Sequence, residues 1–144
     1  MSANNRQVGG EHYRTKEGGV QHWDYCVRAN VTNLEYAASK YLTRWRKKNG
    51  LEDLNKPLHY IDKRIESLNL GIGALRGVDK IHLMFDEFIR DNEVPPTEAV
   101  IIDLVMHWKH LSHLLNARDM LKRLISEEEG KAGEPTSAYI DQDR

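Results

Sequence analysis

The chain has 144 residues, of which 40% are hydrophobic and 30% charged, and its formal net charge is −1. This length and composition are typical of one folded domain with a sizeable core, and no apolar run reaches the ~18 residues that a membrane span needs. The polar first residues lack the pattern of a signal peptide, and the single cysteine, Cys26, has no second cysteine with which to form an internal disulfide. We therefore expect a cytoplasmic protein that is not held in a membrane.

The first 30 residues predict a loop-rich N-terminal arm, because they are rich in glycine and show no sustained periodicity. At most one short helix is expected there, near residues 23–29. The following residues predict a helix that is capped by Asn33 and ends at Asn49-Gly50. Its apolar residues recur every three or four positions, and glycine commonly follows the last turn of a helix.

The middle of the chain predicts a second amphipathic helix, because apolar residues recur at intervals of four and three from Leu54 to Leu68. Pro57 fits only the first turn of this helix, so Asp53 or Asn55 is the expected N-cap. The Gly-rich segment 71–77 then interrupts the helical pattern.

The rest of the chain predicts two more helices and a tail. A third helix includes residues 81–88 and ends before Pro95-Pro96, and a fourth, long helix runs from Thr97 to about Glu128. Residues 130–144 are small, polar and charged, so we expect a flexible, disordered tail. No segment alternates as a β-strand does. The sequence therefore predicts an all-α fold, a small bundle of about four helices, with residues 1–129 as a single helical domain.

The segment KYLTRWRKKNG, which begins at Lys40, concentrates five basic and two aromatic residues in eleven positions. On a helix, Lys40, Arg44 and Lys47 form one basic stripe, and Tyr41 and Trp45 lie beside it. Cations next to aromatic rings suit a ligand with a phosphate at one end and a flat base at the other. The alternative is that the rings belong to the core and the cations are solvated.

Four blocks occur in order along the chain: GGEHYR, VQHWDY, KYLTRWRKKNGLEDLNK and HYIDKRIE, which begin at residues 9, 20, 40 and 59. Together they resemble a small family of tailed-bacteriophage proteins, long filed as a phage domain of unknown function. A podovirus member of that family is a deoxynucleoside monophosphate kinase without a P-loop. The resemblance covers residues 9–66 and implies a nucleotide kinase that works in the cytoplasm of the phage host, with a nucleoside triphosphate as phosphate donor.

The resemblance, the basic and aromatic stripe that begins at Lys40, and the chemistry of phosphoryl transfer together indicate which residues form the site. The expected catalytic residues are Lys40, Arg44, His12 and Asp53. The expected substrate-binding residues are Gly10, Glu11, Tyr13, Trp23, Asp24, Tyr41, Trp45, Lys47, Lys48, Lys56, His59 and Tyr60. No resemblance extends over residues 67–144, so residues 77–128 are expected to form a helical scaffold.

The chemistry of phosphoryl transfer suits these residue types, because it depends mainly on positioning and on neutralising the charge of the phosphate oxygens. The cations would supply that charge. A carboxylate from Glu11, Asp24 or Asp53 would hold a metal on the phosphates or accept a proton. Whether a divalent metal such as Mg²⁺ is required stays open, since no sequence pattern indicates ligands for it. The alternative role for Asp53 is to cap the following helix.

Three histidines and the single cysteine lie outside the blocks. His107, His110 and His113 are spaced by three on the predicted long helix, which favours interface or half-buried histidines over metal ligands. Cys26 is expected to be a small buried side chain, because the spacing indicates no partner histidine that would activate it.

Three functions therefore stay open: a deoxynucleoside monophosphate kinase, a non-catalytic protein that binds or sequesters nucleotides such as a defence signal, and a nucleic-acid binder. The near-neutral net charge argues against nucleic acid as the main partner. The predicted helix over residues 97–126 carries apolar residues on more than one face, which predicts a homo-oligomer built through it.

Overall fold

Every regular element in the described residues, 18–72 and 81–132 of this computed structural model, is a helix, as the sequence predicts. In chain order these elements are α1 (His22–Ala29), α2 (Asn33–Arg44), the 3₁₀ turn η2 (Trp45–Lys47), α3 (Leu51–Leu54), α4 (Lys56–Asn69), α5 (His82–Asp91), α6 (Pro96–Met106) and α7 (Leu111–Ala132). The helices outnumber the four or so predicted, because a single helical turn precedes α4 and the C-terminal helix is divided in two.

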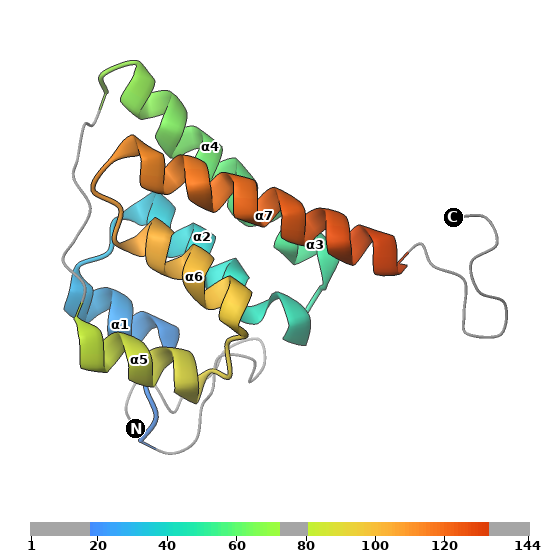
Figure 1. Cartoon of the computed structure of the whole chain (residues 1–144). Coiled ribbons are helices and arrows are strands. Elements are labelled where there is room, and N and C mark those ends of the chain that lie inside the picture. The colour runs from blue at the N-terminus through green and yellow to red at the C-terminus, as the bar shows by residue number, and fades with distance from the viewer. Residues whose placement is uncertain (1–17, 73–80, 133–144) are drawn as a thin grey trace, which may run out of the picture.

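Four helices, α2, α4, α6 and α7, form the body of the fold (Figure 1). α2 packs on α4 and on α6, and α7 packs on the same two helices, so the four close into a bundle. α1 and α5 pack on each other, and α1 also contacts α2. The interior is filled with fully buried apolar side chains from all four helices of the bundle: Leu42, Ile61, Ile101, Ile102, Val105, Leu114 and Leu121.

Three helices lie where local sequence signals predict them. α1 is the short helix expected near residues 23–29. The N-cap of α2 is Thr32, one residue before the predicted Asn33, and α2 ends at Arg44, where the 3₁₀ turn η2 carries the chain on to Lys47 before Gly50. Pro57 lies in the first turn of α4, and Asn55 occupies its N-cap position. Between α2 and α4 the chain turns at Gly50 with a φ of 58°, a conformation that glycine adopts without the steric penalty of a Cβ.

The single helix predicted from Thr97 to about Glu128 is wrong, because residues 107–110 divide it into α6 and α7. His107 ends α6 with its ring held on both sides. Its Nδ1 lies 2.6 Å from Oδ1 of Asp103, and its Nε2 lies 2.5 Å from the hydroxyl of Tyr25 on α1. The contact with Tyr25 ties the end of α6 to α1. The helix ends here although apolar residues continue to recur at helical spacing through the segment, so tertiary contacts outweigh the local pattern.

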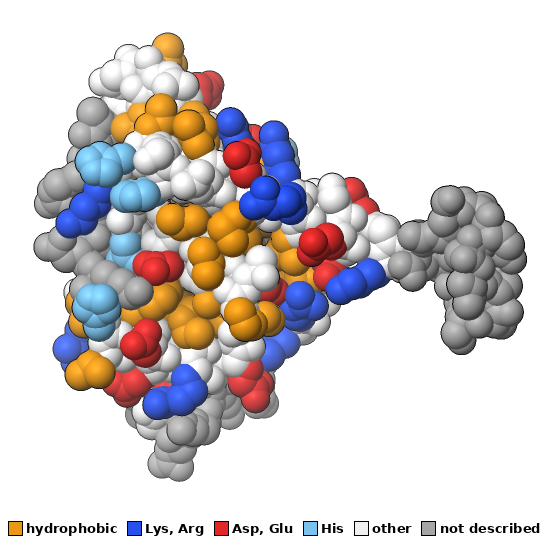
Figure 2. Space-filling model, viewed as in Figure 1, with side chains coloured by type: hydrophobic (Ala, Val, Ile, Leu, Met, Phe, Trp, Pro, Cys, Tyr) orange, Lys and Arg blue, Asp and Glu red, His pale blue; other side chains and the backbone are white. Residues whose placement is uncertain are grey.

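The break lets α6 and α7 fold back on each other as an antiparallel hairpin (Figure 1). The hairpin buries apolar residues that would otherwise need a partner, since Ile101, Val105 and Trp108 are at most 4% exposed. Apolar side chains still gather on the outer surface over α6 and α7 (Figure 2). Among them Val100 is 48% exposed, so the apolar surface that stays uncovered on these helices is smaller than the sequence predicts.

The described residues also bear on the limits of the domain. α7 continues through Ala132, past residue 130, where the tail is predicted to begin. The rest of that tail, the predicted arm before residue 18 and the Gly-rich residues 73–80 lie outside the described residues. In the two described ranges, no helix combines the length and apolarity needed to cross a membrane.

Candidate functional site

Tyr41 on α2 lies at the centre of a group of cations. The group, which we call the Tyr41 cluster, consists of Lys40, Tyr41, Arg44, Asp53, Lys56 and Tyr60. Measured to the centroid of the Tyr41 ring, Lys40 Nζ lies at 5.3 Å, Arg44 Cζ at 4.5 Å and Lys56 Nζ at 4.8 Å. Cations at these distances are attracted by the electron-rich face of an aromatic ring. All six residues are site residues in the sequence prediction, and the structure brings them together.

Three consecutive elements position the Tyr41 cluster. Lys40 and Arg44 are one turn apart on α2. The chain then turns at Gly50, and α3 and α4 follow as neighbours with α4 antiparallel to α2. As a result Tyr60 on α4 stacks on Tyr41, with ring planes 4° apart in angle and centroids 6.2 Å apart. The site is thus built from a local helix spacing and one tight reversal of the chain.

Asp53 is the carboxylate of the cluster, and its side chain is fully buried. Its Oδ1 accepts hydrogen bonds from Lys56 Nζ at 3.1 Å and from Asn49 Nδ2 at 3.4 Å, and its Oδ2 lies 3.5 Å from Arg44 Nε. Burial raises the pKa of Asp53, but these hydrogen bonds and positive charges outweigh it and hold the pKa below its ordinary value. Because it is buried behind the cations, Asp53 is placed to position them rather than to touch a ligand.

The Tyr41 cluster has an excess of positive charge. Three cations and one carboxylate belong to the cluster, and Arg44 and Lys56 both lie beside that carboxylate, Asp53. In the described part of the chain, Lys40 has no carboxylate at ion-pair distance. The Lys56 side chain is 38% exposed, so its ammonium group is reachable from solvent. Ammonium groups of this kind attract a phosphate monoester, which carries −1.5 to −2 at pH 7.

Trp45 is predicted to flank the basic stripe, but the structure places its ring in the core. It is 4% exposed, and its indole N–H donates to Oε2 of the buried Glu98 at 3.1 Å. The guanidinium of Arg46 covers the ring at 4.2 Å and donates to the same carboxylate at 2.9 Å. The ring is therefore not open for stacking on a base, which favours the core alternative for this residue.

The other predicted substrate-binding residues are dispersed. Lys47 is exposed and lies 3.7 Å from Glu93, whereas Lys48 and His59 are exposed outside the Tyr41 cluster. On α1, Trp23 is 39% exposed, and the Asp24 carboxylate accepts a hydrogen bond from the backbone N–H of Gln21 at 2.9 Å. The four expected site residues of the first block lie outside the described residues: Gly10, Glu11, His12 and Tyr13.

A buried ion pair between α2 and α4 was missed by the sequence analysis. Arg64 donates to the Glu35 carboxylate from Nε at 2.8 Å and from Nη2 at 3.1 Å, and Trp108 donates its indole N–H at 2.7 Å. Thr32 donates its hydroxyl to the same carboxylate. Burial alone would raise the pKa of Glu35, but these four interactions have the larger effect, so the pKa of Glu35 lies below its ordinary value. The sequence signal that could have indicated this pair is that Glu35 and Arg64, of opposite charge, interrupt the apolar stripes of two neighbouring helices.

A second buried polar group connects α1 to α2. His22 Nε2 lies 2.8 Å from Ser39 Oγ and 3.4 Å from Cys26 Sγ, so the prediction that Cys26 has no histidine partner is wrong. Burial raises the pKa of the Cys26 thiol to about 12, which keeps it protonated and unreactive. Burial, together with the charge of Lys40, lowers the pKa of His22 to about 3. Both residues therefore serve as neutral parts of the core.

The described residues contain no group of three or more histidine, cysteine or acidic side chains placed to hold a metal ion. The rings of His110 and His113 lie 5.4 Å apart beyond the end of α6, while the ring of His107 contacts Asp103 and Tyr25 instead. The three histidines thus do not converge on one point.

Comparison with known proteins gives no match, whether to a family model, to a curated protein or to a solved structure. The resemblance to the phage kinase family stays a prediction from four sequence blocks.

Proposed function

We propose that the Tyr41 cluster binds the phosphate group of a nucleotide, and that the chain is a kinase that phosphorylates deoxynucleoside monophosphates. The observation that carries this proposal is the arrangement of three cations around one aromatic ring over a single buried carboxylate. Phosphoryl transfer relies on positioning and charge neutralisation more than on covalent chemistry, so cations fixed in place are its main requirement.

The members of the cluster take different roles in this proposal. Lys40 and Lys56 contact the phosphate oxygens, because their ammonium groups lie over the Tyr41 ring and can be reached from solvent. Arg44 adds its charge from a buried position, since it is 8% exposed and lies beside Asp53. Asp53 positions Arg44 and Lys56, and its hydrogen bond to Lys56 raises the pKa of that lysine.

The phosphate donor in this proposal is a nucleoside triphosphate. Mg²⁺ is usually held by only one or two carboxylates together with substrate phosphates, so it would be bound mainly through the donor. The buried Asp53 is committed to Lys56 and Arg44 and is not placed to hold it.

One observation favours a second candidate, a protein that binds or sequesters nucleotides without turning them over. The carboxylate of the Tyr41 cluster, Asp53, is fully buried and is hydrogen bonded to Lys56 and Asn49. It is therefore not free to accept the proton of an attacking phosphate, which a general base would do. Binding, in contrast, needs only the cations.

A titration and a turnover assay test both candidates. We expect deoxynucleoside monophosphates to bind the wild type, and Lys40→Ala and Lys56→Ala each to weaken binding roughly tenfold or more, as the loss of a charge-assisted hydrogen bond to phosphate implies. Lys122→Ala is the matched control, because Lys122 is an exposed lysine on α7 and is not a member of the Tyr41 cluster.

Incubation with a nucleoside triphosphate, followed by chromatography, distinguishes the kinase from the binder. Formation of the diphosphate supports the kinase, and tight binding without product supports the second candidate. If no monophosphate binds the wild type, or if the two cluster variants bind as well as Lys122→Ala does, both proposals are wrong.

A further inference from the structure

The three cations of the Tyr41 cluster differ in what holds them besides the Tyr41 ring. Arg44 and Lys56 each have a second partner, the carboxylate of Asp53, at 3.5 Å and 3.1 Å. Across residues 18–72 and 81–132, Lys40 has no carboxylate at such a distance, and its Nζ lies 5.3 Å from the centroid of the Tyr41 ring. Lys40 is therefore held by an aromatic ring rather than by an ion pair.

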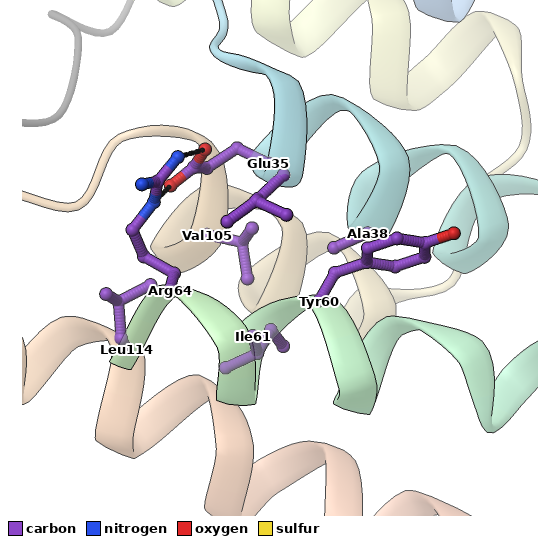
Figure 3. A pocket seen from close by; sticks show the side chains of 8 residues that line it. Glu35, Ala38, Tyr60, Ile61, Arg64, Val105 and Leu114 are labelled. Carbon is purple, nitrogen blue, oxygen red and sulfur yellow. Dashed lines mark hydrogen bonds and ion pairs between the residues drawn. The ribbon is translucent and has the colours of Figure 1, made fainter. Parts of the chain in front are cut away.

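The Tyr41 ring is itself fixed by the packing of α2 on α4. It is half-buried and stacks on the Tyr60 ring, with an angle of 4° between the two planes. Tyr60 extends from α4 across Ala38 of α2, and the ion pair of Glu35 with Arg64 joins the same two helices beyond it (Figure 3). The ring thus has a defined position from which it can hold a cation.

The surroundings of the Tyr41 ring favour cations over a base as its neighbours. Arg44 Cζ and Lys56 Nζ lie 4.5 Å and 4.8 Å from the ring centroid, closer than Lys40, and Tyr60 stacks parallel to the ring. A base that stacked on Tyr41 would have to displace one of these groups, and the cations are the groups that a phosphate needs.

We propose that Tyr41 is a positioning residue of the phosphate site, whose ring holds the ammonium group of Lys40 in place for the phosphate and does not contact the base. This inference rests on the proposed function, and it gives Tyr41 a different role from the stacking that the sequence suggests. A lysine side chain loses conformational freedom when it is immobilised by a ligand. A lysine that is already held on a ring loses less, so it binds the phosphate more tightly.

The attraction between a cation and a ring depends on the electron density of the ring face. Fluorine atoms on the ring withdraw that density and change the shape of the side chain little. The proposal therefore predicts that phosphate affinity falls when the ring at position 41 is fluorinated, whereas a ring that only fills space would tolerate the change.

The first test compares Tyr41→Phe with the same substitution carrying three fluorine atoms on the ring. The ligands, titrated by calorimetry, are a deoxynucleoside monophosphate and deoxyribose 5-phosphate, which has the phosphate but no base. We expect the fluorinated variant to bind both ligands roughly fivefold more weakly than Tyr41→Phe does. Tyr36 provides the matched control pair, because it is another half-buried tyrosine of α2 and its ring contacts His22 instead of the Tyr41 cluster.

Equal affinities of the two Tyr41 variants for both ligands overturn the positioning role. A loss that is confined to the monophosphate also overturns it, because the ring would then act on the base. Equal melting temperatures of the two variants show that a loss of affinity does not come from a disturbed fold.

The second test is a double-mutant cycle, which shows whether Tyr41 acts through Lys40. We expect Tyr41→Leu to weaken binding of deoxyribose 5-phosphate clearly in the wild type and much less beside Lys40→Ala. Equal losses in the two backgrounds overturn the inference and leave the phosphate site standing, provided that Lys40→Ala alone weakens binding. Absence of binding of both ligands to the wild type overturns the proposed function itself.

Discussion

His22 gives the protein a dependence of stability on pH that can be calculated from its burial. The side chain is 3% exposed, and burial together with the charge of Lys40 lowers its pKa from 6.5 to about 3. In the unfolded chain the imidazole takes up a proton below pH 6.5, whereas in the folded protein it stays neutral. The unfolded state therefore binds more protons as the pH falls, and the free energy of unfolding decreases.

The size of this effect follows from the two pKa values of His22. The contribution of His22 to the free energy of unfolding is constant above pH 6.5. Below pH 6.5 the free energy of unfolding declines by about 1.4 kcal/mol for each pH unit, down to a pH of about 3. Between pH 7 and pH 5 the loss amounts to about 2 kcal/mol. The carboxylates Glu35 and Asp53, whose pKa values are lowered, add their own losses only in more acidic solution, so they do not obscure this window.

Urea unfolding at pH 7 and pH 5 measures the effect, with His22→Gln as the comparison. Glutamine cannot titrate, and its amide can still hydrogen bond to Ser39. We expect the wild type to lose about 2 kcal/mol more than His22→Gln between the two pH values. Other histidines are present in both proteins and cancel in the difference. Equal losses in the two proteins would refute the reasoning that His22 is buried and neutral.

Three further predictions concern the ion pairs and the surface. Arg44→Ala is expected to lower the free energy of unfolding, measured with urea, by about 2 kcal/mol, because it leaves Asp53 buried with one cation fewer. A decrease of less than about 0.5 kcal/mol, as expected for a solvated arginine, would contradict this prediction. Glu35→Ala should lower it by roughly 3 kcal/mol or more, since Arg64 would stay buried without its carboxylate, and a stability equal to that of the wild type would show that the pair is not buried. Sedimentation velocity at micromolar concentration should show an oligomer for the wild type and a monomer for Val100→Asp, and a monomeric wild type would rule out the predicted association.

The sequence predicts the helices and sites that depend on local spacing. α1, α2 and α4 follow from periodicity, capping residues and the position of Pro57, all of which act within a few residues. Lys40 and Arg44 share a face for the same reason, because four residues make about one helical turn. The all-α class follows from the sum of such local signals.

The features that the sequence does not predict depend on contacts between distant residues. The division of the C-terminal helix at His107 arises from its contact with Tyr25, which lies 82 positions away. The ion pair of Glu35 with Arg64 joins residues 29 positions apart. The local sequence is compatible with Trp45 facing either a ligand or the core. Its hydrogen bond to Glu98, which lies 53 positions away, accompanies its position in the core. No local pattern carries information about such partners.

The structure of a complex with a deoxynucleoside monophosphate would show whether the Tyr41 cluster holds a phosphate. We expect the phosphate oxygens to lie within hydrogen-bonding distance of the ammonium groups of Lys40 and Lys56, above the ring of Tyr41. A phosphate bound elsewhere, with these two lysines in contact only with solvent, would contradict the account.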